Sequence, residues 1–317
     1  MPDDVPATFR LAAPAKINLF LEVLGKRDDG YHELVTCMVP LTLADELTFS
    51  ADSQLSMSCN DQSLPLDEHN LVMKAAKALQ RQTQSTLGAA IHLNKRIPSP
   101  AGLGGGSSDA ATTLRGLNQL WQTQLSEPEL MNLAATIGSD VPFFLAQSAA
   151  WCRGRGEKVT PFRMEENLYL LIVCPQQGLS TSAVYQSLQA APMTGNLLPT
   201  NGEKAMAEAI RMRNLDAISN ALFNRLQGTA ERCLPLLVEL REMFDKAKTL
   251  GLCLGSLMSG SGSSYFVVCR SLVETQRLAQ WFLQLWDGGV TIHGMGTMEA
   301  KPGLHERSVK VFQTSTV

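Results

Sequence analysis

Residues 98–108 read PSPAGLGGGSS, a stretch that places four glycines and two hydroxyl side chains directly before an amphipathic segment. Glycine accepts positive φ and allows close backbone approach, so several N–H groups can converge on one anion. The apolar residues of the segment that follows recur at helical spacing. They predict a helix from Ser107 to about Gln122, capped by Ser107 or Ser108. Because a helix N-terminus attracts negative charge, the stretch predicts a phosphate-binding loop.

The residues before this loop predict a strand, because Ile91, Leu93, Lys95 and Ile97 alternate with other residues. The loop differs from two common nucleotide motifs. No lysine follows its glycines as in a Walker A loop, and it does not fit the dinucleotide fingerprint with its acidic residue about 20 positions later. A tight connection from strand to helix that holds no ligand stays open as the structural alternative.

Length and composition predict a soluble protein with two domains. The chain has 317 residues, of which 44% are hydrophobic and 18% charged, and its net charge is −3. No long stripe of lysine and arginine appears, which argues against a nucleic-acid partner. No segment approaches the roughly 20 apolar residues that a membrane span needs, and residues 1–9 lack the apolar core of a signal peptide. We therefore expect a cytoplasmic protein without a membrane partner.

Cysteine and histidine usage agrees with that expectation. The seven cysteines, at positions 37, 59, 152, 174, 233, 253 and 269, are scattered without a C-x-x-C pair, and several lie in apolar runs. This spacing predicts reduced core residues. The five histidines form no pair typical of a zinc site.

The first half of the chain is predicted to combine sheet and helices. Strand-like alternation covers Ile17 to Val23, with further strands over 33–41 and 46–50 and a polar turn at 25–30. Helices are expected from about Asn70 and over 127–137. A boundary near 161–167 divides the chain into an N-terminal domain, residues 1–164, and a C-terminal domain, residues 165–317.

The second half is predicted to be a ferredoxin-like α+β domain. It begins with a buried strand over 168–174 and continues with helical segments from 204 to 250. Strands over 254–258 and 265–269 flank the glycine-rich residues 259–263. A helix over 272–285 and a last strand around 290–298 complete a βαββαβ-like order.

Three further segments extend the phosphate loop to a catalytic hypothesis. Residues 14–19 place Lys16 and Asn18 on one face of an apolar strand, residues 138–142 place Asp140 after a helix, and residues 259–263 offer a second glycine loop. Each has an ordinary reading by itself. Lys16 suits a solvated strand, Asp140 suits a turn or helix cap, and the second loop suits a hairpin.

Taken together, these segments resemble the motifs of the GHMP kinases, a family named for galactokinase, homoserine kinase, mevalonate kinase and phosphomevalonate kinase. The similarity extends over essentially the whole chain. Residues 15–19 (AKINL) and 25–34 (GKRDDGYHEL) are similar to the branch that acts on a cytidine diphosphate-linked methylerythritol in non-mevalonate isoprenoid synthesis. The resemblance implies two α+β domains, the first like ribosomal protein S5 domain 2 and the second ferredoxin-like, with ATP and this small-molecule substrate in the cleft between them.

The resemblance also implies roles for individual residues. Asp140 would be the base for the substrate's 2-hydroxyl, Lys16 its cationic partner, and Ser108 a ligand of Mg²⁺. The ATP phosphates would contact Pro98, Ser99, Pro100, Ala101, Gly102, Leu103, Gly104, Gly105, Gly106, Ser107 and Ser108. The substrate would contact Asn18, Tyr31, His32, Tyr185, Gly260 and Gly262, with Tyr31, His32 and Tyr185 around the cytosine.

The chain departs from the family pattern at two places, and two other functions of the same fold stay open. Asp109 stands where many relatives have asparagine, which suggests a role through Mg²⁺, and the predicted helix around 220–227 lacks the acidic residues common there. A decarboxylase of the diphosphomevalonate type uses the same fold and ATP, but the Tyr31-His32 segment counts against it. A non-catalytic ligand-binding module should have lost Lys16 or Asp140, and both are present.

Overall fold

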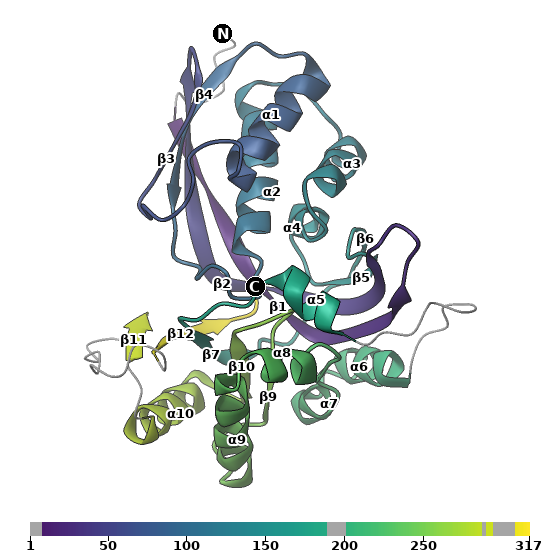
Figure 1. The fold of residues 1–317 in the computed structure, drawn as a ribbon, viewed down its shortest axis with the longest axis vertical. Helices are drawn as coiled ribbons and strands as arrows, with labels where there is room; N and C mark the ends of the chain where they lie inside the picture. Colours follow the sequence, from purple (N-terminus) through teal and green to yellow (C-terminus); the bar gives the residue numbers. More distant parts are fainter. Residues whose placement is uncertain (1–7, 189–200, 287–289, 294–307) are drawn as a thin grey trace.

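The computed structural model describes residues 8–188, 201–286, 290–293 and 308–317, and it is built on two sheets (Figure 1). Within these residues the first sheet has seven strands. They are β1 (Thr8–Lys26), β2 (His32–Asp52), β3 (Leu55–Cys59), β4 (Gly88–Asn94), β5 (Ala150–Gly154), β6 (Lys158–Pro161) and β8 (Phe223–Asn224). The order is β3-β4-β2-β1-β8, and β5 pairs with both β2 and β6.

The long antiparallel pair of β1 and β2 carries much of the site. Its register runs from Thr8 opposite Ser50 to Lys26 opposite His32, with a shift between Asn18 and Phe20. The two strands predicted over 33–41 and 46–50 are one continuous strand, so that division was wrong. The alternation expected from Ile17 to Val23 does not separate a buried face from an exposed one, because residues 15–21 are buried on both faces of the sheet.

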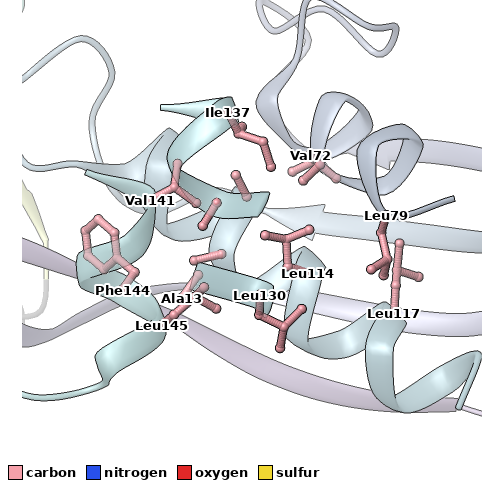
Figure 2. Packing of buried hydrophobic residues seen from close by; sticks show 14 of the residues in the cluster. Ala13, Val72, Leu79, Leu114, Leu117, Leu130, Ile137, Val141, Phe144 and Leu145 are labelled. Atoms are coloured by element: carbon pink, nitrogen blue, oxygen red, sulfur yellow. The ribbon is translucent and has the colours of Figure 1, made fainter. Parts of the chain in front are cut away.

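Four helices cover one face of the first sheet (Figure 1). They are α1 (Leu71–Thr83), α2 (Gly105–Leu120), α3 (Glu127–Ile137) and α4 (Val141–Ala146). Figure 2 shows how Val72, Leu79, Leu114 and Leu117 from α1 and α2 meet in a shared core. The helices expected from about Asn70 and over 127–137 are confirmed, and the Asn70 side chain caps α1 by accepting from the N–H of Val72.

The second sheet has the order β11-β12-β7-β10-β9, in strands β7 (Tyr169–Pro175), β9 (Gly255–Met258), β10 (Tyr265–Cys269), β11 (Val290–His293) and β12 (Val309–Ser315). Without the edge strand β11 this is the βαββαβ arrangement of a ferredoxin-like domain, so the predicted α+β fold is confirmed. The predicted last strand corresponds to β11 over 290–293, and its continuation to 298 lies outside the described residues. β12 was not predicted. The helices of this half are α5 (Thr181–Ser187), α6 (Asn201–Arg211), α7 (Leu215–Asn220), α8 (Gln227–Cys233), α9 (Leu236–Thr249) and α10 (Leu272–Leu285).

The two halves share a core as well as a boundary. One buried cluster joins Ile17, Leu19 and Val39 from the first half to Leu170 and Phe266 from the second. The short strand β8 also extends the first sheet from the second half, since Phe223 pairs with Phe20. The helix expected around 220–227 was therefore wrong, because its middle residues pair with β1. The main change from one sheet to the other falls between β6 and β7, and the domain boundary at 164/165 stays a prediction.

All seven cysteines lie in described residues, and one of them departs from its predicted location. All seven are free, and five of them are buried. Cys59 is partly buried, and Cys233 is exposed at the end of α8. The expectation that the cysteines are core residues was therefore wrong for Cys233. Among the described residues, no helix combines the length and apolar character that crossing a membrane requires.

Candidate active site

A cavity of about 920 Å³ lies where the two halves meet. Its walls come from the glycine loop, from β1 and β2, from α5, and from the second glycine loop. The lining residues that sequence reasoning had also named are Lys16, Asn18, Tyr31, His32, residues 98–107, Asp140, Tyr185 and Gly260. The structure thus brings nearly all the predicted site residues to one cavity.

The first glycine loop is folded tightly against the second. Gly102 and Gly104 have φ of +73° and +72°, a backbone conformation that residues other than glycine rarely adopt. A Cβ on Gly102 would lie 2.2 Å from the carbonyl oxygen of Ser259, so the contact itself requires glycine. The Gly102 carbonyl accepts hydrogen bonds from Ser259 Oγ at 3.0 Å and from Lys16 Nζ at 2.9 Å.

The helix behind this loop begins earlier than the sequence predicted. Gly104 is the N-cap of α2, without a side-chain capping bond, so the expected cap at Ser107 or Ser108 was wrong. The first helical residues, Gly105, Gly106 and Ser107, line the cavity. N–H groups of a first helical turn have no partner within the helix, so these residues suit an anionic ligand.

A buried ionic cluster holds the loop from behind. Lys95 Nζ lies 2.5 Å from Asp45 Oδ2 and 2.9 Å from Asp109 Oδ2. Asp45 Oδ1 also accepts from the backbone N–H groups of Arg96 and Ile97. Burial raises the pKa of Asp109 to about 7, with Lys95 opposing the shift. The cluster ties both ends of the loop to β2, and Asp109 faces Lys95 rather than the cavity.

Lys16 lines the cavity, and two of its three N–H groups are engaged in hydrogen bonds. It donates to Asn18 Oδ1 at 2.6 Å and to the Gly102 carbonyl at 2.9 Å. Asn18 Nδ2 in turn donates to Thr36 Oγ1 at 2.8 Å, and that hydroxyl donates to the Phe20 carbonyl at 2.7 Å. Because the Thr36 hydroxyl already donates its proton to the Phe20 carbonyl, it can only accept a hydrogen bond from Asn18. This fixes the orientation of the Asn18 amide and keeps its oxygen directed at Lys16.

Asp140 faces the remaining side of the Lys16 ammonium group. Its Oδ2 lies 3.8 Å from Lys16 Nζ, and about one third of its side chain is exposed, against 4% for Lys16. Burial lowers the pKa of Lys16, while the charge of Asp140 and, to a smaller degree, Cys152 oppose that shift. Asp140 precedes α4 but makes no capping bond with its side chain, so its carboxylate is free for a ligand.

Aromatic residues surround the other end of the cavity. The rings of His32 and Tyr185 lie 5.2 Å apart, and the Tyr31 ring, which is half exposed, carries the guanidinium of Arg155 at 4.7 Å. Burial, and to a smaller degree Lys26, lower the pKa of His32, so its ring is neutral at pH 7 and offers one donor and one acceptor. This end suits a flat polar ring.

The second glycine loop contributes unequally. Gly260 lines the cavity, and a Cβ there would lie 3.1 Å from Lys16 Nζ. Gly262 is not among the lining residues and faces Met258 and Leu179 instead. The buried amide of Asn224 donates to the carbonyls of Met258 and Gly260 at 2.7 and 2.8 Å, and so holds this loop in place.

The oxygen atoms near the loop fit a hard cation that accompanies phosphates. Mg²⁺ usually takes one or two protein oxygens and leaves its other positions to water and phosphate. The buried Ser108 hydroxyl has no hydrogen-bond partner among the described residues, although Ser108 does not itself line the cavity. Ser107 and Asp140 do line it. Among the residues that the structure describes, no group of three or more aspartate, glutamate, histidine or cysteine side chains is placed to bind a metal ion.

Three contributors to this site escaped sequence reasoning. Thr36 orients Asn18, Asn224 holds the second loop, and Arg155 covers Tyr31. Thr36 and Asn224 lie outside any glycine-rich or charged motif, whereas Arg155 lies in the glycine-rich and charged stretch 153–158 (RGRGEK). Only strand pairing reveals the roles of Thr36 and Asn224, so no local signal could have found these two. For Arg155 the stretch 153–158 was the local signal, and it was overlooked.

Comparison with known proteins adds independent evidence. Residues 70–148 match the family GHMP kinases N terminal domain, and residues 206–280 match GHMP kinases C terminal. The 4-diphosphocytidyl-2-C-methyl-D-erythritol kinase of Alcanivorax borkumensis is 36% identical over 288 residues, which cover 89% of this chain and 90% of that protein. The kinase of the same name from Protochlamydia amoebophila is 40% identical over 82% of this chain and 84% of that protein.

Solved structures give a consistent picture. A crystal structure of 4-(cytidine 5'-diphospho)-2C-methyl-D-erythritol kinase matches with a TM-score of 0.73 and 32% identity, and covers 97% of this chain and 99% of that one. Homoserine kinase from Cytophaga hutchinsonii matches with a TM-score of 0.65 at 18% identity, over 90% of this chain and 92% of its own. The second likeness concerns the fold alone.

Proposed function

Because this chain belongs to the GHMP kinase family, we propose that it transfers the γ-phosphoryl group of ATP to the 2-hydroxyl of 4-diphosphocytidyl-2-C-methyl-D-erythritol. The product is an intermediate of non-mevalonate isoprenoid synthesis. The observation that carries the proposal is the Lys16–Asp140 pair, which lies in one cavity between a phosphate-type loop and a group of aromatic side chains. The curated relatives that bear this enzyme's name support the choice of substrate.

In this proposal the first glycine loop holds the ATP phosphates. Residues 98–107 surround the phosphates, and the N-terminus of α2 faces them with the N–H groups of its first turn. Ser108, with Ser107 beside it, would hold Mg²⁺, which neutralises phosphate charge when it is bound. Phosphoryl transfer asks the protein mainly for positioning and charge stabilisation, and a backbone cradle provides both.

Asp140 and Lys16 act on the acceptor hydroxyl. The carboxylate of Asp140 accepts the hydroxyl proton as the phosphoryl group is transferred, and the nearby ammonium stabilises the negative charge that develops on the oxygen. Because Asn18 and the Gly102 carbonyl fix the ammonium, it needs no reorganisation during the reaction.

The aromatic end holds the cytosine. Tyr31 and Tyr185 offer ring faces for stacking, and the segment from Tyr31 to His32 offers polar groups to the base edge. Uracil exchanges a donor and an acceptor on that edge, so a site paired to cytosine would be left with opposed polar groups at about 1–3 kcal/mol each. We expect the uridine analogue to lose at least about 100-fold in kcat/KM.

The direct test combines product analysis with omission controls. ADP should appear only when ATP, Mg²⁺ and the cytidine substrate are all present, and mass spectrometry should find one added phosphate on the erythritol part. Phosphate on the ribose, or no transfer at all, contradicts the proposal. Release of CO₂ from a diphosphomevalonate substrate would instead assign the chain to the decarboxylase class.

A further inference from the structure

Arg155 lies in the turn that connects β5 and β6, and it contacts two other segments as well as its own turn. Its guanidinium lies 4.7 Å from the centroid of the Tyr31 ring. Its Nη2 donates to the carbonyl of Ala135, near the end of α3, at 3.2 Å, and its Nε lies 3.9 Å from Glu157 Oε2. The side chain is only one quarter exposed, so the position of the guanidinium is well defined.

The turn that carries Arg155 is tied to the loop that carries Tyr31. Glu33 Oε1 accepts from the N–H of Gly154 at 3.1 Å, and Glu33 Oε2 accepts from Arg27 Nη1 at 2.7 Å. The backbone N–H of Arg27 donates to the Tyr31 carbonyl at 2.8 Å. The two segments therefore keep a fixed relation, although more than 100 residues separate them in the sequence.

We propose that Arg155 is a positioning residue for base recognition, whose guanidinium covers one face of Tyr31 and holds the ring so that its other face stacks on the substrate's pyrimidine. This proposal rests on the proposed function. A half-exposed tyrosine without such a partner would sample several rotamers, and the base would have to order the ring when it binds. The contact removes that cost in advance, and a planar cation over a ring face is itself attractive.

The backbone of the same turn also approaches Asp140, the proposed general base. Kinetics can therefore distinguish a disturbance of the turn from the loss of the Arg155–Tyr31 contact. A Cβ on Gly156 would lie 3.5 Å from Asp140 Oδ1. A substitution that disturbed the turn would therefore change kcat through Asp140. A substitution that only released Tyr31 would change the KM of the cytidine substrate and leave kcat and the KM of ATP unchanged.

The experiment compares Arg155→Gln with Arg155→Lys in steady-state kinetics. Glutamine keeps a hydrogen-bond donor for the Ala135 carbonyl but removes the cation, whereas lysine keeps the cation. We expect Arg155→Gln to raise the KM of the cytidine substrate about three- to tenfold, with kcat within about twofold, and Arg155→Lys to stay nearer the parent. Arg225→Gln is the matched control, because Arg225 makes the same kind of contact with Phe223 outside the cavity. Equal losses in the two Arg155 variants, or a loss confined to kcat, would overturn the proposal.

A double-mutant cycle with Tyr31→Ala decides whether Arg155 acts through that ring. If it does, Arg155→Gln has no further effect on KM in the Tyr31→Ala background. A full effect in that background means that Arg155 contacts the substrate directly, which overturns the proposal. A Tyr31→Ala variant with unchanged KM and intact kinase activity also overturns it and leaves the proposed reaction standing. Absence of phosphoryl transfer by the parent protein would instead contradict the proposed function.

Discussion

Replacing Asp140 by asparagine preserves the shape of the side chain and removes its charge. The carboxylate makes no capping bond to α4 and is about one third exposed, so its contact with the rest of the fold is the ion pair with Lys16. We expect kcat to fall about 10²–10⁴-fold, which corresponds to roughly 3–5 kcal/mol at the transition state. The KM of ATP should change by less than about threefold, because the backbone of another segment binds the phosphates.

The geometry of the pair sets the second part of this prediction. At 3.8 Å, two unit charges attract each other by about 4 kcal/mol at an effective dielectric constant near 20 and by about 1 kcal/mol in water. Because the carboxylate of Asp140 is partly exposed, its attraction to Lys16 lies between these two values. Burial already lowers the pKa of Lys16, and Asp140 opposes that shift. In Asp140→Asn the pKa of Lys16 therefore falls further, and the residual activity should decline at a lower pH on the alkaline side than that of the parent.

The assay is ADP release measured from pH 6 to pH 10 with saturating ATP, together with urea unfolding of each protein. Asp245→Asn serves as the control, because Asp245 is an exposed carboxylate on α9 that is paired with Arg241. A fall in kcat of less than about tenfold in Asp140→Asn would refute the assignment of the base. An unchanged alkaline limb would refute the electrostatic role given to the pair.

Three further substitutions test the framework of the site. Gly102→Ala should raise the KM of ATP at least about tenfold, because the new Cβ would lie 2.2 Å from the Ser259 carbonyl and φ is positive; an unchanged value in an ATP titration would contradict this. Asn224→Ala removes the hydrogen bonds from this buried amide to the carbonyls of Met258 and Gly260, so urea unfolding should show a loss of about 2–3 kcal/mol, and a loss under about 0.5 kcal/mol would count against it. Asp109 has a pKa raised to about 7, so the fold favours its protonated form and the parent loses stability as the pH rises from about 4 to 7. Asp109→Asn should lose less than the parent between unfolding measurements at pH 4 and pH 8, and equal losses would contradict this explanation.

Local patterns predicted the elements whose signals lie within one stretch of chain. The start and apolar spacing of α1, the boundaries of α3 and the order of strand, glycine loop and helix around residues 98–108 were all visible in the sequence. The start of α2 was misjudged because Gly104 adopts positive φ and begins the helix without a side-chain cap. Ser108 is buried within the helix instead.

Long-range pairing explains most of what sequence reasoning missed. Alternation failed in β1 because the strand lies at the junction and is buried on both faces, with a register shift after Asn18. β8 has only two residues, and its partner lies about 200 positions earlier in the chain. The roles of Thr36 and Asn224 depend on such neighbours, and composition or spacing carries no trace of them. Arg155 does stand in a glycine-rich and charged stretch, but its contact with Tyr31 also depends on a distant neighbour.

The pairing of β8 with β1 also limits how genes of this family can recombine. A hybrid that joined residues 1–164 of this chain to the second half of a relative would keep the main-chain bonds between the two strands, because these do not depend on side chains. It would keep the packing of Phe20 on Phe223, 5.6 Å apart, only if the donor had a similar ring at that position. We therefore expect hybrids to lose less stability when both strands come from the same parent.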